Sequence, residues 1–192
     1  MDIKTKKIVN SILFFANKDQ NRTINRLKLI KLLWLSDRLH LNTHGRVILK
    51  DSYVAMPHGP VPSYTVNFSR QNLPEYFSNP NQYDIKADAV ADERFFSKSD
   101  LEVMTTIWEK FGDFSNFQLR DLSHKFPEWI RYEKELNDEN LPKSYPMVME
   151  DFFEAPKTDD NMDIFNVEGI AETLSQYRVH ESIQSNLNGI CR

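Results

Sequence analysis

The sequence predicts a mainly α fold of the α+β class, a helical domain around a buried central helix with a small antiparallel β element. Residues 27–41 are apolar on most of the circumference of a helix, which is typical of a core helix rather than a surface one. Residues 55–61 cannot continue a helix, because Pro57 and Pro60 lack amide donors and restrict the residues before them. With 192 residues, of which 40% are hydrophobic, the chain can bury a sizeable core.

The N-terminal part of the chain is expected to contain two long helices. Apolar residues at helical spacing predict the first helix over residues 3–16. Asn25 can cap the second helix, which is the central one, and Gly45 ends it. We expect residues 46–60 to be extended and rich in turns. Residues 62–68 should form a short helix, since a proline suits a first helical turn.

The C-terminal part is expected to alternate short strands and helices. Residues 83–87 and 93–96 are candidate strands. Two capping-box patterns, Ser97 with Asp100 and Ser115 with Gln118, predict helices to Gly112 and to about residue 125. A competing box, Ser99 with Glu102, leaves the start of the first of these helices open. Further helical segments are expected near residue 129, at 147–153 and at 166–183.

The domain organisation follows from length and local composition. A chain of this length suggests one domain, with room for an appendage. Residues 154–163 contain Pro156 and four acidic residues, which indicates a linker. We therefore expect one domain over residues 1–155, and a linker with a C-terminal helical appendage over residues 156–192.

Charge is distributed unevenly along the chain. Residues 1–50 hold eleven of the 24 Lys and Arg residues but only three of the 28 Asp and Glu residues. The two parts can neutralise each other within the molecule or present two faces of opposite sign. The sequence alone leaves both alternatives open.

The sequence argues against an enzyme, a cofactor and a metal site. Asp37, His40 and His44 share one helical face and are candidate metal ligands, but no His-Glu-x-x-His pattern or fourth ligand accompanies them. His58 is a candidate general base without a partner placed by the sequence. There is also no Gly-rich phosphate loop, nucleophile elbow or paired-carboxylate signature.

The compartment is expected to be the cytoplasm. The single cysteine, Cys191, excludes a disulfide framework within the chain and fits a reducing environment. No 18-residue apolar span is present, so no membrane crossing is expected.

Two helices predicted between Ser97 and Lys125 have helix-turn-helix spacing, which raises DNA binding as an alternative. The second helix would then read the DNA. Its charge argues against this role, because Arg120 and Lys125 are offset by Asp113 and Asp121, whereas DNA readers concentrate basic residues. A plain packed hairpin is the other interpretation.

Several motifs, taken in order, resemble one known family. Residues 28–37, Lys-Leu-Ile-Lys-Leu-Leu-Trp-Leu-Ser-Asp, and residues 55–61, Ala-Met-Pro-His-Gly-Pro-Val, are similar to two signatures of the Panacea (SocA-like) antitoxin domain. Residues 96–101 resemble a helix start of that domain, with Phe96 in place of the usual Leu, and Trp34 stands where the family has Tyr. Its further Leu-x-x-Leu-Thr-His and Trp pattern resembles Leu119, Leu122, Ser123, His124 and Trp129. The resemblance covers roughly residues 3–155.

The resemblance implies a bacterial or phage-associated type II antitoxin that neutralises a cognate toxin by direct protein contact, without catalysis. It also implies a helical fold with a small antiparallel sheet. The expected partner-binding residues carry or adjoin the family pattern: Trp34, Asp37, Arg38, His58, Gly59, Pro60 and Val61. Two alternatives remain: a helix-turn-helix regulator that binds DNA at its own promoter, and an adaptor that delivers the toxin to a protease.

Overall fold

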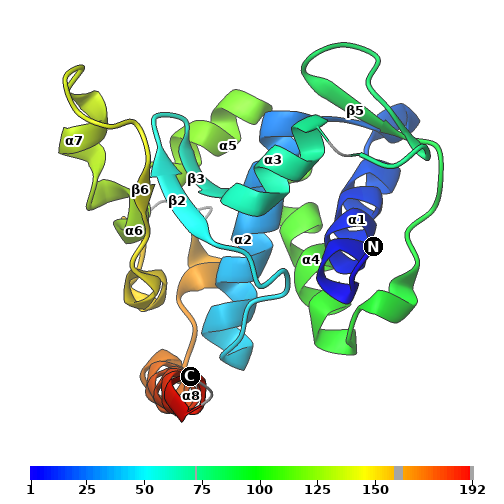
Figure 1. The fold of residues 1–192 in the computed structure, drawn as a ribbon. Helices are drawn as coiled ribbons and strands as arrows, with labels where there is room; N and C mark the ends of the chain where they lie inside the picture. The colour runs from blue at the N-terminus through cyan, green and yellow to red at the C-terminus, as the bar shows by residue number, and fades with distance from the viewer. Residues whose placement is uncertain (72, 158–161, 191–192) are drawn as a thin grey trace.

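The fold is mainly α, as predicted, and is built around one central helix (Figure 1). A computed structural model describes the chain except for residues 72, 158–161 and 191–192, and it describes side chains as far as residue 183. The central helix is α2 (Arg26–His44). The helices that pack against it include α1 (Ile3–Lys18), α4 (Lys98–Phe111) and α5 (Asn116–Ser123).

Helix α2 begins and ends where the sequence predicts. The Asn25 side chain accepts hydrogen bonds from the amides of Leu27 and Lys28, and Gly45 terminates the helix with a left-handed φ of 68°. Every residue from Leu29 to Asn42 is buried, polar residues included. The all-round apolar pattern therefore did identify a core helix, but it gives no reason for the buried polar side chains.

Two small antiparallel sheets flank the helices, and one of them contains a hairpin. The first has the strand order β1 (Thr23–Asn25), β5 (Asp84–Ala87), β4 (Phe77–Ser78). The second has the order β3 (Gly59–Pro62), β2 (Tyr53–Met56), β6 (Tyr145–Pro146). Strand β5 confirms the strand expected at residues 83–87.

The strand expected at residues 93–96 is wrong. Residues Glu93–Phe95 form a short 3-10 helix, and the Asp92 side chain accepts a hydrogen bond from the amide of Arg94 at its start. The local aspartate cap gives the backbone of these residues a partner other than a neighbouring strand.

The Gly-Pro-Val segment lies in a strand. Strands β2 and β3 form a hairpin in which Met56 pairs with Gly59, so that the turn falls on Pro57 and His58. All four residues of β3 are buried. The sequence placed residues 46–60 in an extended, turn-rich region but did not predict the pairing.

The capping boxes agree with the sequence prediction. Both expected capping boxes are present, and at the start of α4 Ser97 pairs with Asp100 rather than Ser99 with Glu102. The remaining elements are η1 (Gln20–Arg22), α3 (Ser63–Gln71), η2 (Glu93–Phe95), α6 (Pro127–Ile130), α7 (Glu133–Asn137), η3 (Met149–Phe153), η4 (Asp163–Phe165) and α8 (Ile170–Ile190).

The C-terminal segment returns to the core. Phe165, in η4, is 1% exposed and packs against Phe111 and Phe126. Helix α8 lies against α2, and its Tyr177 ring contacts Phe153. The expected linker at residues 154–163 lies partly outside the described residues, and the domain division at residue 155 stays a prediction. Among the helices of the described chain, none has the length and apolar content needed to span a membrane.

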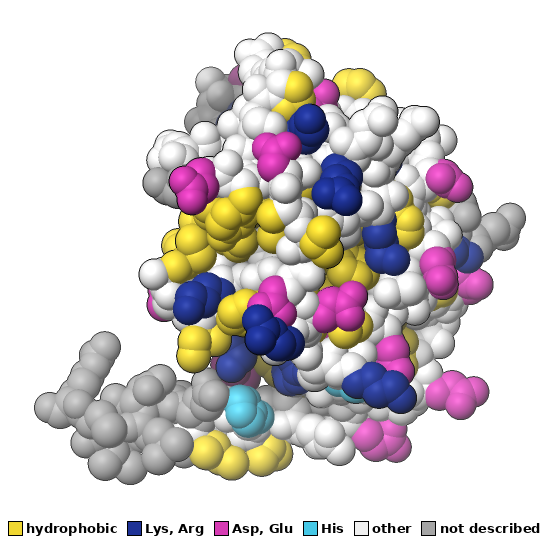
Figure 2. Space-filling view, turned by 90° about the vertical axis from the view of Figure 1, so that its right-hand side faces the viewer, with side chains coloured by type: hydrophobic (Ala, Val, Ile, Leu, Met, Phe, Trp, Pro, Cys, Tyr) yellow, Lys and Arg dark blue, Asp and Glu magenta, His cyan; other side chains and the backbone are white. Residues whose placement is uncertain are grey.

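Opposite charges from the two parts of the chain meet within the molecule. Lys7 and Arg46 both pair with Asp100, at 2.6 and 2.8 Å, and Arg38 pairs with Glu128 at 2.9 Å. Figure 2 shows basic and acidic side chains interspersed over one face, with no separation into zones. These contacts favour intramolecular neutralisation of the N-terminal basic residues.

Candidate functional site

The seven residues expected to bind a partner lie on α2 and on the β2–β3 hairpin. His58, at the turn, is exposed, whereas the other six are buried. Direct contact with a partner therefore stays a prediction. Of the seven side chains, only that of His58 is accessible to a partner. The six buried residues instead determine how the hairpin and its surroundings are held.

Trp34 belongs to the core. Its side chain is fully buried, and its ring meets Phe126 edge to face at 4.8 Å. The indole Nε1 is buried without a hydrogen-bond partner among the described residues. Burial is the role that its place on the apolar helix predicts.

Asp37 fastens α2 to the segment that leads into the hairpin. One carboxylate oxygen accepts the amides of Ile48 and Leu49, at 2.6 and 2.9 Å, and the other accepts the Tyr53 hydroxyl at 2.6 Å. Burial raises the pKa of Asp37 to about 6, although the three hydrogen bonds act in the opposite direction. Asp37 therefore has a full set of partners within the protein.

Arg38 is the centre of a buried polar network. Its Nε donates to Glu128 Oε1 at 2.9 Å, and its two terminal nitrogens donate to Asn42 Oδ1 and to the Glu154 carbonyl, at 3.0 and 2.6 Å. The guanidinium also lies over the Phe126 ring, 4.6 Å from its centroid. Burial raises the pKa of Glu128, and the positive charge of Arg38 opposes that shift.

Lys31 and Gly59 meet where the hairpin touches α2. Lys31 is fully buried, and its Nζ donates to the Pro60 carbonyl at 2.8 Å. Gly59 has a φ of +93°, and a Cβ atom there would lie 2.2 Å from Ser123 Oγ and 2.5 Å from Lys31 Nζ. Sequence reasoning did not single out Lys31, although its position inside the apolar segment 27–41 is the signal of its burial.

Replacing Gly59 by alanine should destabilise the protein by at least about 2 kcal/mol, because the substitution adds overpacking to backbone strain. Gly45→Ala is a matched control. Gly45 has a similar positive φ of +68°, but a Cβ there would meet its nearest atom, in Thr173, at 3.6 Å. Urea unfolding measures both variants, and equal losses would contradict a steric role for the close approach at Gly59.

The hairpin is also tied to the α5–α6 region. Trp129 Nε1 donates to the Met56 carbonyl at 2.9 Å, and the His124 ring stacks on the Trp129 ring at 3.8 Å. The turn at Pro57 and His58 is thus held from α2 and from α6. This fixes the direction in which His58 is presented.

The helix pair α4–α5 shows few features of a DNA reader. Arg120 pairs with the adjacent Asp121 at 2.7 Å and lies over the Phe117 ring. The exposed residues of α5 are Phe117, Gln118 and Asp121. DNA binding and protease delivery both stay predictions.

The three candidate metal ligands do not converge. Both carboxylate oxygens of Asp37 already accept hydrogen bonds within the protein. The rings of His40 and His44 stack on each other, with their centroids 4.5 Å apart. His40 lies 2.8 Å from the Arg46 carbonyl through Nδ1 and 3.2 Å from Asp100 through Nε2. Burial opposes ionisation of Asp100, yet hydrogen bonds from His40 and Lys7 hold its pKa well below the usual value. The described part of the chain contains no cluster of three or more His, Cys, Asp or Glu residues that could hold a metal ion.

A match to a known protein family covers the part of the chain that contains these residues. The family described as "Antitoxin SocA-like, Panacea domain" matches residues 29–130, which include α2, the hairpin and the Trp129 contact. Neither curated proteins nor solved structures gave a match. Because the match spans more than half of the chain, the protein belongs to the SocA-like antitoxin family and carries its Panacea domain.

Proposed function

We propose that the protein neutralises a cognate toxin in the cytoplasm by direct protein contact, without catalysing a reaction. Family membership supports an antitoxin role. The polar residues of the signature, Asp37 and Arg38, are saturated by contacts within the protein, which suits a rigid binding body. The observation that carries the direct-contact mechanism is an acidic surface that begins just after the family match.

That surface, the acidic arm, comprises residues 133–154 and includes α7, β6 and η3. In Figure 1, α7 and the chain that follows it form the outer left edge of the molecule. The arm contains seven Asp or Glu residues and two Lys residues. Its exposed carboxylates are those of Glu133, Asp138, Glu139, Glu150 and Glu154.

Local contacts limit how far cations neutralise the arm. Lys143 folds over the loop, where its Nζ donates to the carbonyls of Leu136 and Asp138, at 2.9 and 2.7 Å. Arg131, at the base of the arm, pairs with the buried Asp151. An exposed acidic surface of this kind complements a basic one, such as the surfaces with which enzymes bind RNA or nucleotides. We therefore expect charge attraction between the acidic arm and a basic surface of the toxin to steer their first encounter.

Co-expression with the product of the neighbouring gene tests the proposal. We expect growth rescue and a stoichiometric complex that co-purifies. A triple arm variant, Glu133→Gln, Asp138→Asn and Glu139→Gln, should slow association about tenfold at low salt and flatten its salt dependence.

The control changes the same net charge at exposed carboxylates elsewhere, with Glu93→Gln, Glu109→Gln and Glu172→Gln. Stopped-flow or surface-plasmon measurements give the association rates. If the wild-type chain gives no growth rescue and forms no complex, direct neutralisation is rejected. Equal slowing in both triple variants would reject the arm as the contact.

A further inference from the structure

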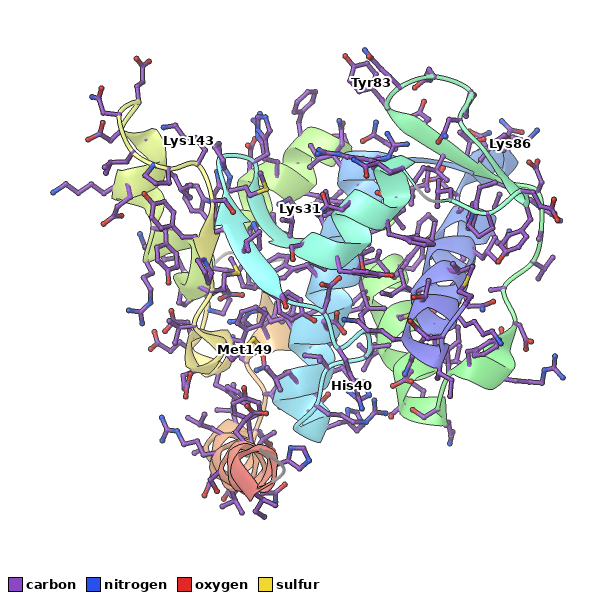
Figure 3. All side chains as sticks on the ribbon, viewed as in Figure 1. Lys31, His40, Tyr83, Lys86, Lys143 and Met149 are labelled. Atoms are coloured by element: carbon purple, nitrogen blue, oxygen red, sulfur yellow. The ribbon has the colours of Figure 1, made fainter. Side chains whose placement is uncertain are left out.

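Three basic side chains gather between the hairpin turn and the C-terminal end of α5. His58 is exposed on the turn, His124 is half-buried at the end of α5, and Lys31 is fully buried on α2. Figure 3 places Lys31 inside the fold beside the hairpin. Because Gly59 has no side chain, only backbone separates Lys31 Nζ from the turn that carries His58.

Lys31 lacks a counter-ion. Its Nζ makes one hydrogen bond, to the Pro60 carbonyl at 2.8 Å, and no carboxylate among the described residues pairs with it. Burial lowers the pKa of the Lys31 amine well below its usual value. A neutral donor such as glutamine would hold the Pro60 carbonyl as well, so that bond alone does not account for a lysine.

His124 is incomplete in a similar way. Its Nε2 is buried and has no hydrogen-bond partner among the described residues. Burial, together with charge repulsion from Lys31 and Arg120, lowers the pKa of His124 to about 4. Asp121, the carboxylate nearby, already pairs with Arg120 at 2.7 Å.

An anionic group at this point would relieve the repulsion. The charges of Lys31, Arg120 and His58 disfavour a protonated His124, whereas the carboxylate of Asp121 favours it. A carboxylate beside His124 would reverse that balance, because an opposite charge stabilises the protonated ring. The Trp129 face, against which the ring stacks, also stabilises a cation.

We propose that His58, His124 and the buried Lys31 form a recognition site for an acidic side chain of the cognate toxin, and that binding there takes up a proton. The inference rests on the proposed function and names one contact within it. The acidic side chain meets His58 at the surface and the half-buried ring of His124 beside it, and Lys31 adds its charge from behind the turn.

Calorimetry of the complex tests the site. The full chain is titrated with its toxin at pH 7 in two buffers that differ in ionisation enthalpy, so that the difference in heat reports proton uptake. His124→Phe retains the stacked ring but cannot take up a proton. We expect it to abolish the uptake and to raise the Kd about tenfold.

Two further variants separate binding from folding. Lys31→Gln keeps a donor for the Pro60 carbonyl, and His58→Asn changes an exposed side chain, so both should melt close to the wild type and still bind more weakly. The control is Lys28→Gln, one turn earlier on α2, where Nζ already pairs with Asp19 at 2.8 Å. This control should bind like the wild type and retain the proton uptake.

The outcomes that overturn the site differ from those that overturn the proposed function. A wild-type complex without proton uptake, or an unchanged Kd in His58→Asn and His124→Phe, overturns the site and leaves direct neutralisation standing. If the same variants lose binding to promoter DNA while toxin binding is unchanged, the ligand is a phosphate and the proposal is wrong. A wild-type chain that forms no complex with the toxin defeats the proposed function, and the site with it.

Discussion

Arg38→Met is expected to destabilise the protein by about 3–5 kcal/mol, because it leaves the Glu128 carboxylate buried without its charge partner. Both side chains of this pair are 0% exposed. The substitution also removes the donors to Asn42 Oδ1 and to the Glu154 carbonyl. Urea unfolding at pH 7 measures the loss.

A double-mutant cycle separates the pair from the surrounding network. Glu128→Gln keeps an acceptor for the guanidinium and should cost less than Arg38→Met. The double variant Arg38→Met with Glu128→Gln should be more stable than the sum of the single losses indicates, since neither buried charge remains unpaired. Strict additivity of the two losses would show that the ion pair contributes nothing beyond its separate contacts.

The helices were the most predictable part of the fold, because their signals are local. Asn25 and Gly45 mark the two ends of α2 within a turn of the residues that they cap, and the Ser97 and Ser115 boxes do the same for α4 and α5. A residue pattern of three or four positions is enough to specify such a contact. The predicted helical class and the order of elements followed from these signals.

The hairpin and the expected strand at 93–96 show where local reasoning stops. Strand β3 holds two prolines, which weaken any strand signal, yet Gly59 to Pro62 pair with β2 because Lys31 and Trp129 hold the hairpin in place. Those partners lie 29 and 73 residues away from the atoms they contact. No pattern within residues 46–62 contains that information.

The candidate site was found in sequence only as a family signature. Its residues were expected to touch a partner, but the structure uses Asp37 and Arg38 to join α2 to distant segments, with Glu128 coming from 90 positions along the chain. The grouping of Lys31 with His124 has no sequence signal of its own. It exists because α5 and the hairpin meet over one face of α2.

Asp37→Ala is the second substitution with a large expected effect. It leaves the amides of Ile48 and Leu49 and the Tyr53 hydroxyl buried without an acceptor. Each orphaned donor costs about 1–3 kcal/mol, so a loss of about 4 kcal/mol is expected. Asp37→Asn is the matched control, because its amide oxygen can still accept both backbone donors at nearly the same shape.

The same pair of variants tests the pKa of Asp37. Because the folded-state pKa of about 6 lies above the ordinary value of 3.8, the native state binds its proton more tightly than the unfolded chain. The contribution of Asp37 to stability is therefore full below pH 3.8 and is lost as the pH rises to about 6, by about 3 kcal/mol. Asp37→Asn has no such proton, so the difference in unfolding free energy between variant and wild type should shift in favour of the variant across that interval. Urea unfolding of both proteins from about pH 3.5 to about pH 7, a range that spans the interval between the two pKa values, measures that difference. A constant difference over the whole range would show that the three hydrogen bonds to the carboxylate fully offset its burial, so that folding leaves its pKa unchanged.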